Sequence, residues 1–276
     1  MTTLTKKQIN WLNKCIKAYS RTPGTWTLNP KTGLVDVDGA FDCHNQGLKG
    51  FKEVKFGKVT DSFNCYDNRL TSLAGSPQEV GGHFHCGDNR LTSLEGAPQK
   101  VGKSFYCDAN QLTSLVGAPL KVGDHFDCVG NRLISLVGAP QKVGGDFPCS
   151  YNRLTSLEGA PQRVGGYFSC SYNRLTTLVG APLKVGGNFW CDNNRLTSLE
   201  GAPLKVGREL WCDANPVSAK TLVTIFDKMQ EGHSFVMAAA SLRNKMSKKD
   251  WKLISSNIPE SARPGVSMLA RFGAFE

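Results

Sequence analysis

The chain has 276 residues, of which 40% are hydrophobic, and its formal net charge is +10. No apolar run approaches the length of a membrane span, and residues 1–8 lack the apolar core of a signal peptide. These features argue against a membrane protein and predict a cytoplasmic one. The excess charge lies at the ends, because residues 1–24 carry five Lys and Arg and no acid, whereas residues 25–215 carry 19 basic and 18 acidic residues.

The N-terminal segment predicts a helix followed by two strands. Thr5 and Gln8 have capping-box spacing, and apolar residues follow at helical intervals. Residues 25–28 and 34–37 alternate as strands on either side of a loop that contains Pro and Gly. We therefore expect residues 1–39 to form a helix and β-hairpin cap.

The middle of the chain repeats itself every 21 residues. An asparagine marks each copy, and a cysteine precedes it by three residues. The asparagines are Asn68, Asn89, Asn110, Asn131, Asn152, Asn173, Asn194 and Asn215, and the cysteines run in step from Cys65 to Cys212. A fixed period of this length is typical of a solenoid. The prediction is a repeat solenoid over residues 40–215, built on a parallel β-sheet of 21-residue coils.

One copy shows how a coil is expected to fold. Phe168 and Cys170 lie two residues apart, so in a strand both face the core, while Ser169 and the flanking residues face outward. Asn173 follows at the bend, where its side-chain amide can satisfy backbone groups that the turn leaves unpaired. Pro148 falls inside one of these strands and lacks the N–H that a ladder needs, which predicts a local gap in pairing.

The ten cysteines predict buried thiols rather than disulfides or a metal site. Eight of them share the inward column, where a thiol packs as a small apolar group. There is no Cys-x-x-Cys pair, and one cysteine per coil does not supply four zinc ligands. We expect no metal and no cofactor.

The motif Asn-Arg-Leu-Thr-Ser-Leu, followed by a return segment with Pro, resembles the leucine-rich repeat family. It looks most like the short repeats of bacterial effector-type members, and with its flanks it is similar to uncharacterised tailed-phage proteins. The chain departs from the family in having Phe and Cys where Leu or Val is usual, and in a longer approach to the strand. The resemblance implies a leucine-rich-repeat-like solenoid that binds a partner, and the departures affect its expected curvature.

Residues 216–276 no longer follow the repeat. Apolar residues at helical spacing, interrupted by Gly232, Pro259 and Pro264, predict several short helices. The expected division is therefore an N-terminal cap (1–39), a solenoid (40–215) and an α-helical C-terminal cap (216–276).

Exposed aromatic residues on the C-terminal coils are the first candidate binding site. Trp190, Trp211 and Tyr167 fall in outward columns of the strands, and Tyr151 and Tyr172 share a column nearer the rim. Large aromatics of this kind are enriched in protein interfaces. We expect the two tryptophans to stack on successive coils. A structural alternative is that they pack against the C-terminal cap.

Two basic rows are the second candidate. The first row contains Arg69, Arg90, Arg132, Arg153, Arg174 and Arg195, and the second contains Lys100, Lys121, Lys142, Arg163, Lys184 and Lys205. Such rows can follow a phosphate backbone. Aspartates close to the arginine row are expected to pair with it and offset its charge.

No pattern indicates catalysis. His83, His85 and His125 have no carboxylate or cysteine at ligand spacing in the sequence, and no phosphate loop or nucleophile elbow is present. We therefore expect a non-enzymatic scaffold that binds a protein, and the phage resemblance implies an inhibitor or decoy acting on a host defence or regulatory protein. The alternatives are a nucleic-acid-binding protein that uses the arginine row and basic ends, and a structural or assembly adaptor.

Overall fold

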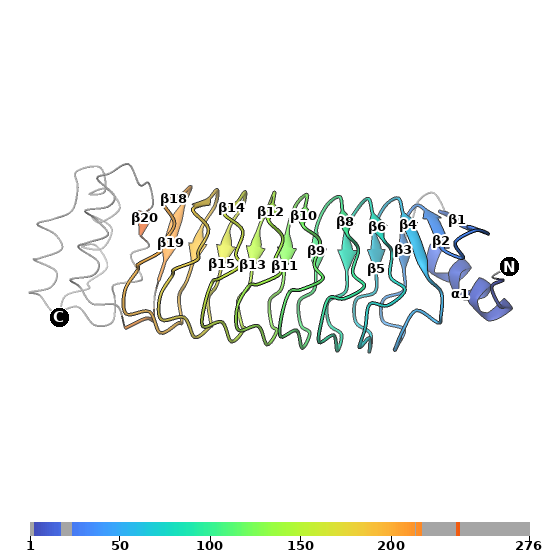
Figure 1. The fold of residues 1–276 in the computed structure, drawn as a ribbon, viewed down its shortest axis with the longest axis horizontal. Coiled ribbons are helices and arrows are strands. Elements are labelled where there is room, and N and C mark those ends of the chain that lie inside the picture. Colours follow the sequence, from blue (N-terminus) through green and yellow to red (C-terminus); the bar gives the residue numbers. More distant parts are fainter. Residues whose placement is uncertain (1–2, 18–23, 213, 217–235, 238–276) are drawn as a thin grey trace, which may run out of the picture.

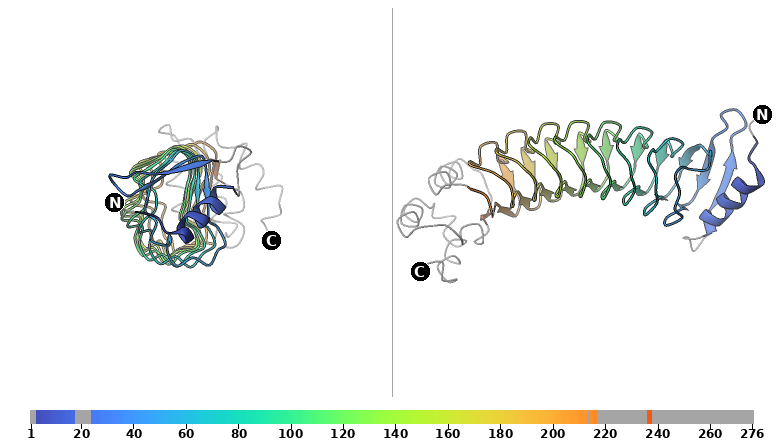
Figure 2. Two further views of the ribbon diagram at one scale, coloured as in Figure 1. Left: turned by 90° about the vertical axis from the view of Figure 1, so that its right-hand side faces the viewer. Right: turned by 90° about the horizontal axis from the view of Figure 1, so that it is seen from below.

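A computed structural model describes residues 3–17, 24–212, 214–216 and 236–237. These residues form an elongated solenoid whose coils follow one another along a gently curved axis (Figures 1 and 2). The solenoid predicted from the 21-residue period is confirmed. The predicted C-terminal helical cap lies almost entirely outside the described residues, so the cap and the three-part division of the chain stay predictions. Its two described residues, Val236 and Met237, form a strand that pairs with Glu209–Leu210 rather than the expected helix.

The N-terminal end is closed by helix α1 (Lys6–Lys17) and by an antiparallel pair of strands, β1 (Thr25–Leu28) and β2 (Val35–Asp38). The predicted capping box is present, because the Gln8 N–H donates to Thr5 Oγ1 (3.3 Å) and the Thr5 N–H donates to Gln8 Oε1 (2.8 Å). Trp11 places its ring edge-on against Phe41, with 5.4 Å between ring centroids. The helix thereby covers the open core of the first coil.

Each coil contributes two very short strands. The first series contains the core phenylalanines and consists of β3 (Phe41–Asp42), β5 (Phe63–Asn64), β7 (Phe84–His85), β9 (Phe105–Tyr106), β11 (Phe126–Asp127), β13 (Phe147–Pro148), β15 (Phe168–Ser169), β17 (Phe189–Trp190) and β19 (Glu209–Trp211), followed by β20 (Val236–Met237). The second series consists of β4 (Phe56–Val59), β6 (Glu79–Val80), β8 (Lys100–Val101), β10 (Lys121–Val122), β12 (Lys142–Val143), β14 (Arg163–Val164), β16 (Lys184–Val185) and β18 (Lys205–Val206).

The second series is a feature that the sequence analysis missed. Its strands join β1 and β2 in one ten-stranded sheet, parallel throughout except at the first pair. The buried valine of each coil belongs to a short strand that forms a ladder with the coils on either side. The solenoid therefore has two faces that carry sheets. We call them the Lys-strand face (even-numbered strands from β4 to β18) and the Phe-strand face (odd-numbered strands from β3 to β19).

The Phe-strand face is interrupted at Pro148, as predicted. Strands β3 to β11 form one five-stranded parallel sheet, and β13 to β20 form another. Pro148 has no N–H to donate to the preceding strand. Its carbonyl still accepts from the Cys128 N–H (3.1 Å), so the coils remain stacked across the gap.

The core consists of columns that repeat from coil to coil. The phenylalanine rings stack with centroids 5.2–5.8 Å apart, and the Leu and Cys columns are buried beside them. All ten cysteines are buried thiols, as predicted. Burial raises the pKa of the Cys149 thiol well above its usual value, and its Sγ donates to the Ser169 carbonyl (3.1 Å). No helix among the described residues combines the length and apolarity needed to cross a bilayer.

The asparagine column links each coil to the one before it. Asn152 Nδ2 donates to the Cys128 carbonyl of the preceding coil (3.0 Å) and to the Cys149 carbonyl of its own coil (3.2 Å). Its Oδ1 accepts from the Leu133 N–H (3.0 Å). The side chain thus satisfies buried backbone groups at the bend, as the sequence predicted.

Candidate functional site

Four aromatic side chains meet in a hollow on the Phe-strand face of the C-terminal coils. Trp190 and Trp211 reach it from β17 and β19, and Tyr151 and Tyr172 reach it from the bends that follow β13 and β15. Its volume is about 460 Å³. The lining consists of Tyr151, Tyr172, Trp190, Trp211, Ser150, Ser169, Ser171, Asp192 and Asn193. The structure therefore brings together four of the five predicted aromatic residues.

The two tyrosines stand on strained backbone. Tyr151 and Tyr172 both have φ of 54°, in the left-handed region that Asp67 and Asn193 occupy in other coils. Asn, Asp and Gly are suited to this conformation, whereas a bulky aromatic is an outlier there. The rings stack with centroids 4.4 Å apart and an interplanar angle of 8°, and they remain 57% and 46% exposed. The chain thus presents a flat aromatic surface to solvent despite an unfavourable backbone conformation.

The tryptophans do not stack on each other as expected. Trp190 and Trp211 are register partners in β17 and β19, but no ring contact joins them in the described part of the chain. Trp190 instead packs on Tyr167, with centroids 4.9 Å apart. Trp211 Nε1 donates to Glu209 Oε2 (2.8 Å), which holds its ring on its own strand. The Trp190 indole N–H has no acceptor among the described residues.

Tyr167 lies beside the hollow rather than in it. Burial, followed by the negative charge of Asp146, raises the pKa of its phenol. Tyr167 is therefore neutral at physiological pH, and it supports the ring of Trp190 from the side.

A polar network forms the floor of the hollow. Ser150 and Ser169 share a hydrogen bond (2.6 Å), and Ser171 Oγ donates to Asp192 Oδ1 (2.5 Å). Asn193 Nδ2 donates to Asp192 Oδ2 (2.7 Å). The serines are expected from the sequence on an outward polar face, but all three are buried. Sequence reasoning missed this floor, although the shared outward register of Ser150, Ser171 and Asp192 was a usable signal.

The arginine row lies outside the hollow. Arg153, Arg174 and Arg195 are exposed, and none of them pairs with a carboxylate among the described residues. The expected pairing with neighbouring aspartates is therefore wrong for the described carboxylates. The arginines follow the asparagine bend, from which their long side chains extend into solvent.

The N-terminal coils carry a second ring cluster that sequence reasoning also missed. His85 and Tyr106 stack with centroids 4.1 Å apart, and His83 lies beside both. Burial, followed by the charge of His83, lowers the pKa of His85. These residues occupy the same outward columns as Trp190 and Tyr167, so the two clusters are direct counterparts on different coils.

His125 has carboxylate partners, contrary to the expectation from sequence spacing. Its Nε2 lies 3.2 Å from Asp124 Oδ1, and its Nδ1 lies 3.0 Å from Asp146 Oδ2. Asp146 is 21 residues away, so the repeat itself places it on the neighbouring coil. The Asp146 N–H lies 2.9 Å from the same Nδ1, so the tautomer of the ring decides whether that nitrogen accepts from the backbone or donates to the Asp146 carboxylate.

Within the described ranges, no group of three or more His, Cys, Asp or Glu side chains is arranged to hold a metal ion. No protein-family model matches the chain, and no curated protein matches it significantly. The aromatic hollow of the C-terminal coils is therefore the candidate site that the geometry itself defines.

Proposed function

We propose that this protein is a non-catalytic scaffold whose protein partner docks at the aromatic hollow of the C-terminal coils. The observation that carries the proposal is the convergence of Tyr151, Tyr172, Trp190 and Trp211 around one hollow of about 460 Å³. The core of the repeat needs none of these rings, because the phenylalanine column already fills it.

The chemistry of the hollow suits a protein surface. A few Trp and Tyr anchors usually contribute most of the binding energy of an interface. The Trp190 indole N–H has no acceptor among the described residues and can donate to a partner, and Tyr151 and Tyr172 beside it are exposed. The serine and aspartate side chains of the floor hydrogen-bond to one another, so a partner can cover them without leaving their polar groups unpaired.

The resemblance to leucine-rich repeats and to tailed-phage proteins supports a more specific form of the proposal. A phage-encoded solenoid with one aromatic docking site would act by occupying a surface of a host protein, as an inhibitor or decoy of a defence or regulatory protein. The site of action would then be the cytoplasm of the bacterial host.

The test is affinity capture of the full chain from a candidate host lysate, with quantitative mass spectrometry. We expect a stoichiometric protein that the wild type retains and that Trp190→Ala/Trp211→Ala loses. A protein retained equally by both forms would contradict docking at the hollow. Circular dichroism of the double variant establishes that it is folded before it is compared.

A further inference from the structure

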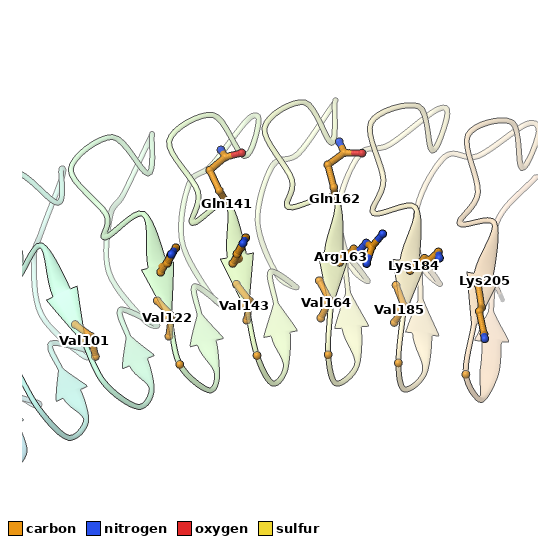
Figure 3. A pocket seen from close by; sticks show the side chains of 17 residues that line it. Val101, Val122, Gln141, Val143, Gln162, Arg163, Val164, Lys184, Val185 and Lys205 are labelled. Carbon is orange, nitrogen blue, oxygen red and sulfur yellow. The ribbon is translucent and has the colours of Figure 1, made fainter.

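The Lys-strand face carries an uninterrupted row of like charges. The row consists of Lys121, Lys142, Arg163, Lys184 and Lys205, which lie on strands β10, β12, β14, β16 and β18, respectively. All five side chains are exposed. Lys121 pairs in register with Lys142, and Lys184 pairs in register with both Arg163 and Lys205. Figure 3 shows Arg163, Lys184 and Lys205 following one another on successive coils.

This arrangement disfavours folding. Like charges directly opposite each other on neighbouring strands repel. The same position accepts an acid two coils before Lys121, where Glu79 pairs with Lys100 (2.6 Å). None of the five cations of the row pairs with a carboxylate among the described residues. The five coils therefore keep repelling cations at a position where the fold also accepts a glutamate.

The row borders an open groove that runs along the solenoid. Its volume is about 1180 Å³, and it extends from β8 to β18. Its floor combines backbone at a column of glycines with the valine column Val101, Val122, Val143, Val164 and Val185. Close stacking of the coils excludes a side chain at the glycines, since a Cβ on Gly144 would collide with the Gly123 carbonyl oxygen. Gln141 and Gln162 line the groove beside the cations (Figure 3). No aromatic side chain of the described residues lines it.

We propose that this groove binds the phosphate backbone of a single-stranded nucleic acid lying along the solenoid axis. Neighbouring strands of a sheet are about 4.8 Å apart, so the five cations cover about 19 Å. Phosphates of a stacked strand advance about 3.4 Å each. A single strand can lengthen to place one phosphate at each coil, whereas a rigid duplex turns its phosphates away from a straight row.

The side chains also favour a phosphate backbone over a folded protein. Lys, Arg and Gln are common donors to phosphate oxygens. Interface anchors such as Trp and Tyr are missing from the groove. Because contacts to phosphate carry no sequence information, binding is expected to be independent of base sequence. This inference uses a different face from the aromatic hollow and does not depend on the proposed protein partner.

The experiment is fluorescence anisotropy with a labelled 20-nucleotide oligothymidylate over a series of salt concentrations. Five phosphate contacts predict a log–log salt slope of about −3.5 for a single strand, so affinity should fall about 100-fold between 50 and 200 mM salt. Lys142→Gln/Arg163→Gln/Lys184→Gln should reduce the slope to about −1.4. The triple variant should be folded, because it removes like-charge repulsion.

The matched control is Arg153→Gln/Arg174→Gln/Arg195→Gln, which removes the same charge from the arginine row. It should keep the wild-type slope. A loss of binding in this control and not in the first variant would overturn the proposal in favour of the arginine row, and a loss in Trp190→Ala/Trp211→Ala would relocate the site to the hollow. The proposal would also fail if the wild type did not bind at 50 mM salt, if duplex DNA bound more tightly, or if polyglutamate of equal charge competed as well as the oligonucleotide.

Discussion

The coils before and after Pro148 share one interior and differ in their exterior. The phenylalanine stack crosses the break, with Phe126 and Phe147 centroids 5.3 Å apart, and Asn152 hydrogen-bonds to the Cys128 carbonyl on the other side. The outward column next to the phenylalanines differs, because it contains His85, Tyr106 and Asp127 before the break and Ser169, Trp190 and Trp211 after it.

This difference indicates which parts of a repeat are constrained. Inward positions must match the coils above and below, since stability in a solenoid comes from neighbouring repeats. Outward positions face solvent, so each coil can carry its own chemistry. The first half carries ionisable groups in the outward column, and the second half carries the aromatic hollow.

The largest expected effect tests whether the two interiors are equivalent. Leu112 and Leu154 occupy the same position in coils on opposite sides of Pro148, and both are completely buried. Truncation of either to Ala should lower the free energy of unfolding by roughly 2–5 kcal/mol. Urea denaturation of both variants should give similar losses. A loss below about 1 kcal/mol in one of them would show that the two halves are packed differently.

The next effect is a pH dependence of the free energy of unfolding, which we expect to come from the coils before Pro148. Burial raises the pKa of Asp127 to about 6. The folded protein therefore binds more protons than the unfolded chain between about pH 4 and pH 6, and this residue lowers stability as pH rises through that window. Asp127→Asn should raise the free energy of unfolding by about 2–3 kcal/mol at pH 7 and change it little below pH 4.

Asn is a suitable replacement, because its Oδ1 can still accept the hydrogen bond that Asp127 Oδ1 receives from the Val129 N–H (2.9 Å). Denaturation midpoints at several pH values would check this prediction. If the variant and the wild type had the same pH dependence, the carboxyl of Asp127 would be solvated rather than buried.

The smallest effect concerns the break itself. Pro148→Ser restores an N–H to the ladder, which contributes about 1 kcal/mol, but it gives up roughly 0.4–1 kcal/mol because proline restricts the unfolded chain. The two contributions nearly cancel, so the free energy of unfolding should change by less than about 0.5 kcal/mol. Thermal melts would measure it. A gain above about 1.5 kcal/mol would identify the break as a weak point of the solenoid.

The features that could be predicted from the sequence are those in which a residue type at a fixed spacing has a single structural role. The asparagine and cysteine columns, the buried leucines, the capping box at Thr5 and the gap at Pro148 follow directly from residue chemistry and spacing. The Lys-Val ladder was missed because a two-residue strand carries no alternation that could reveal it. The partners of Trp190 and His125 were missed because they depend on side-chain direction across coils, which a linear sequence does not display.

The aromatic hollow is proposed to bind the partner, and the fold is not expected to depend on its rings. The most direct test is titration calorimetry of the captured partner against Trp190→Ala/Trp211→Ala and against His85→Ala/Tyr106→Ala, which alters the counterpart rings on the N-terminal coils. Thermal melts of the same samples would report stability. Our expectation is that the tryptophan variant loses at least about 2 kcal/mol of binding free energy, that the His85/Tyr106 variant keeps the wild-type affinity, and that both remain folded. Retained affinity with lost stability in the tryptophan variant would contradict it, because the rings would then serve the fold.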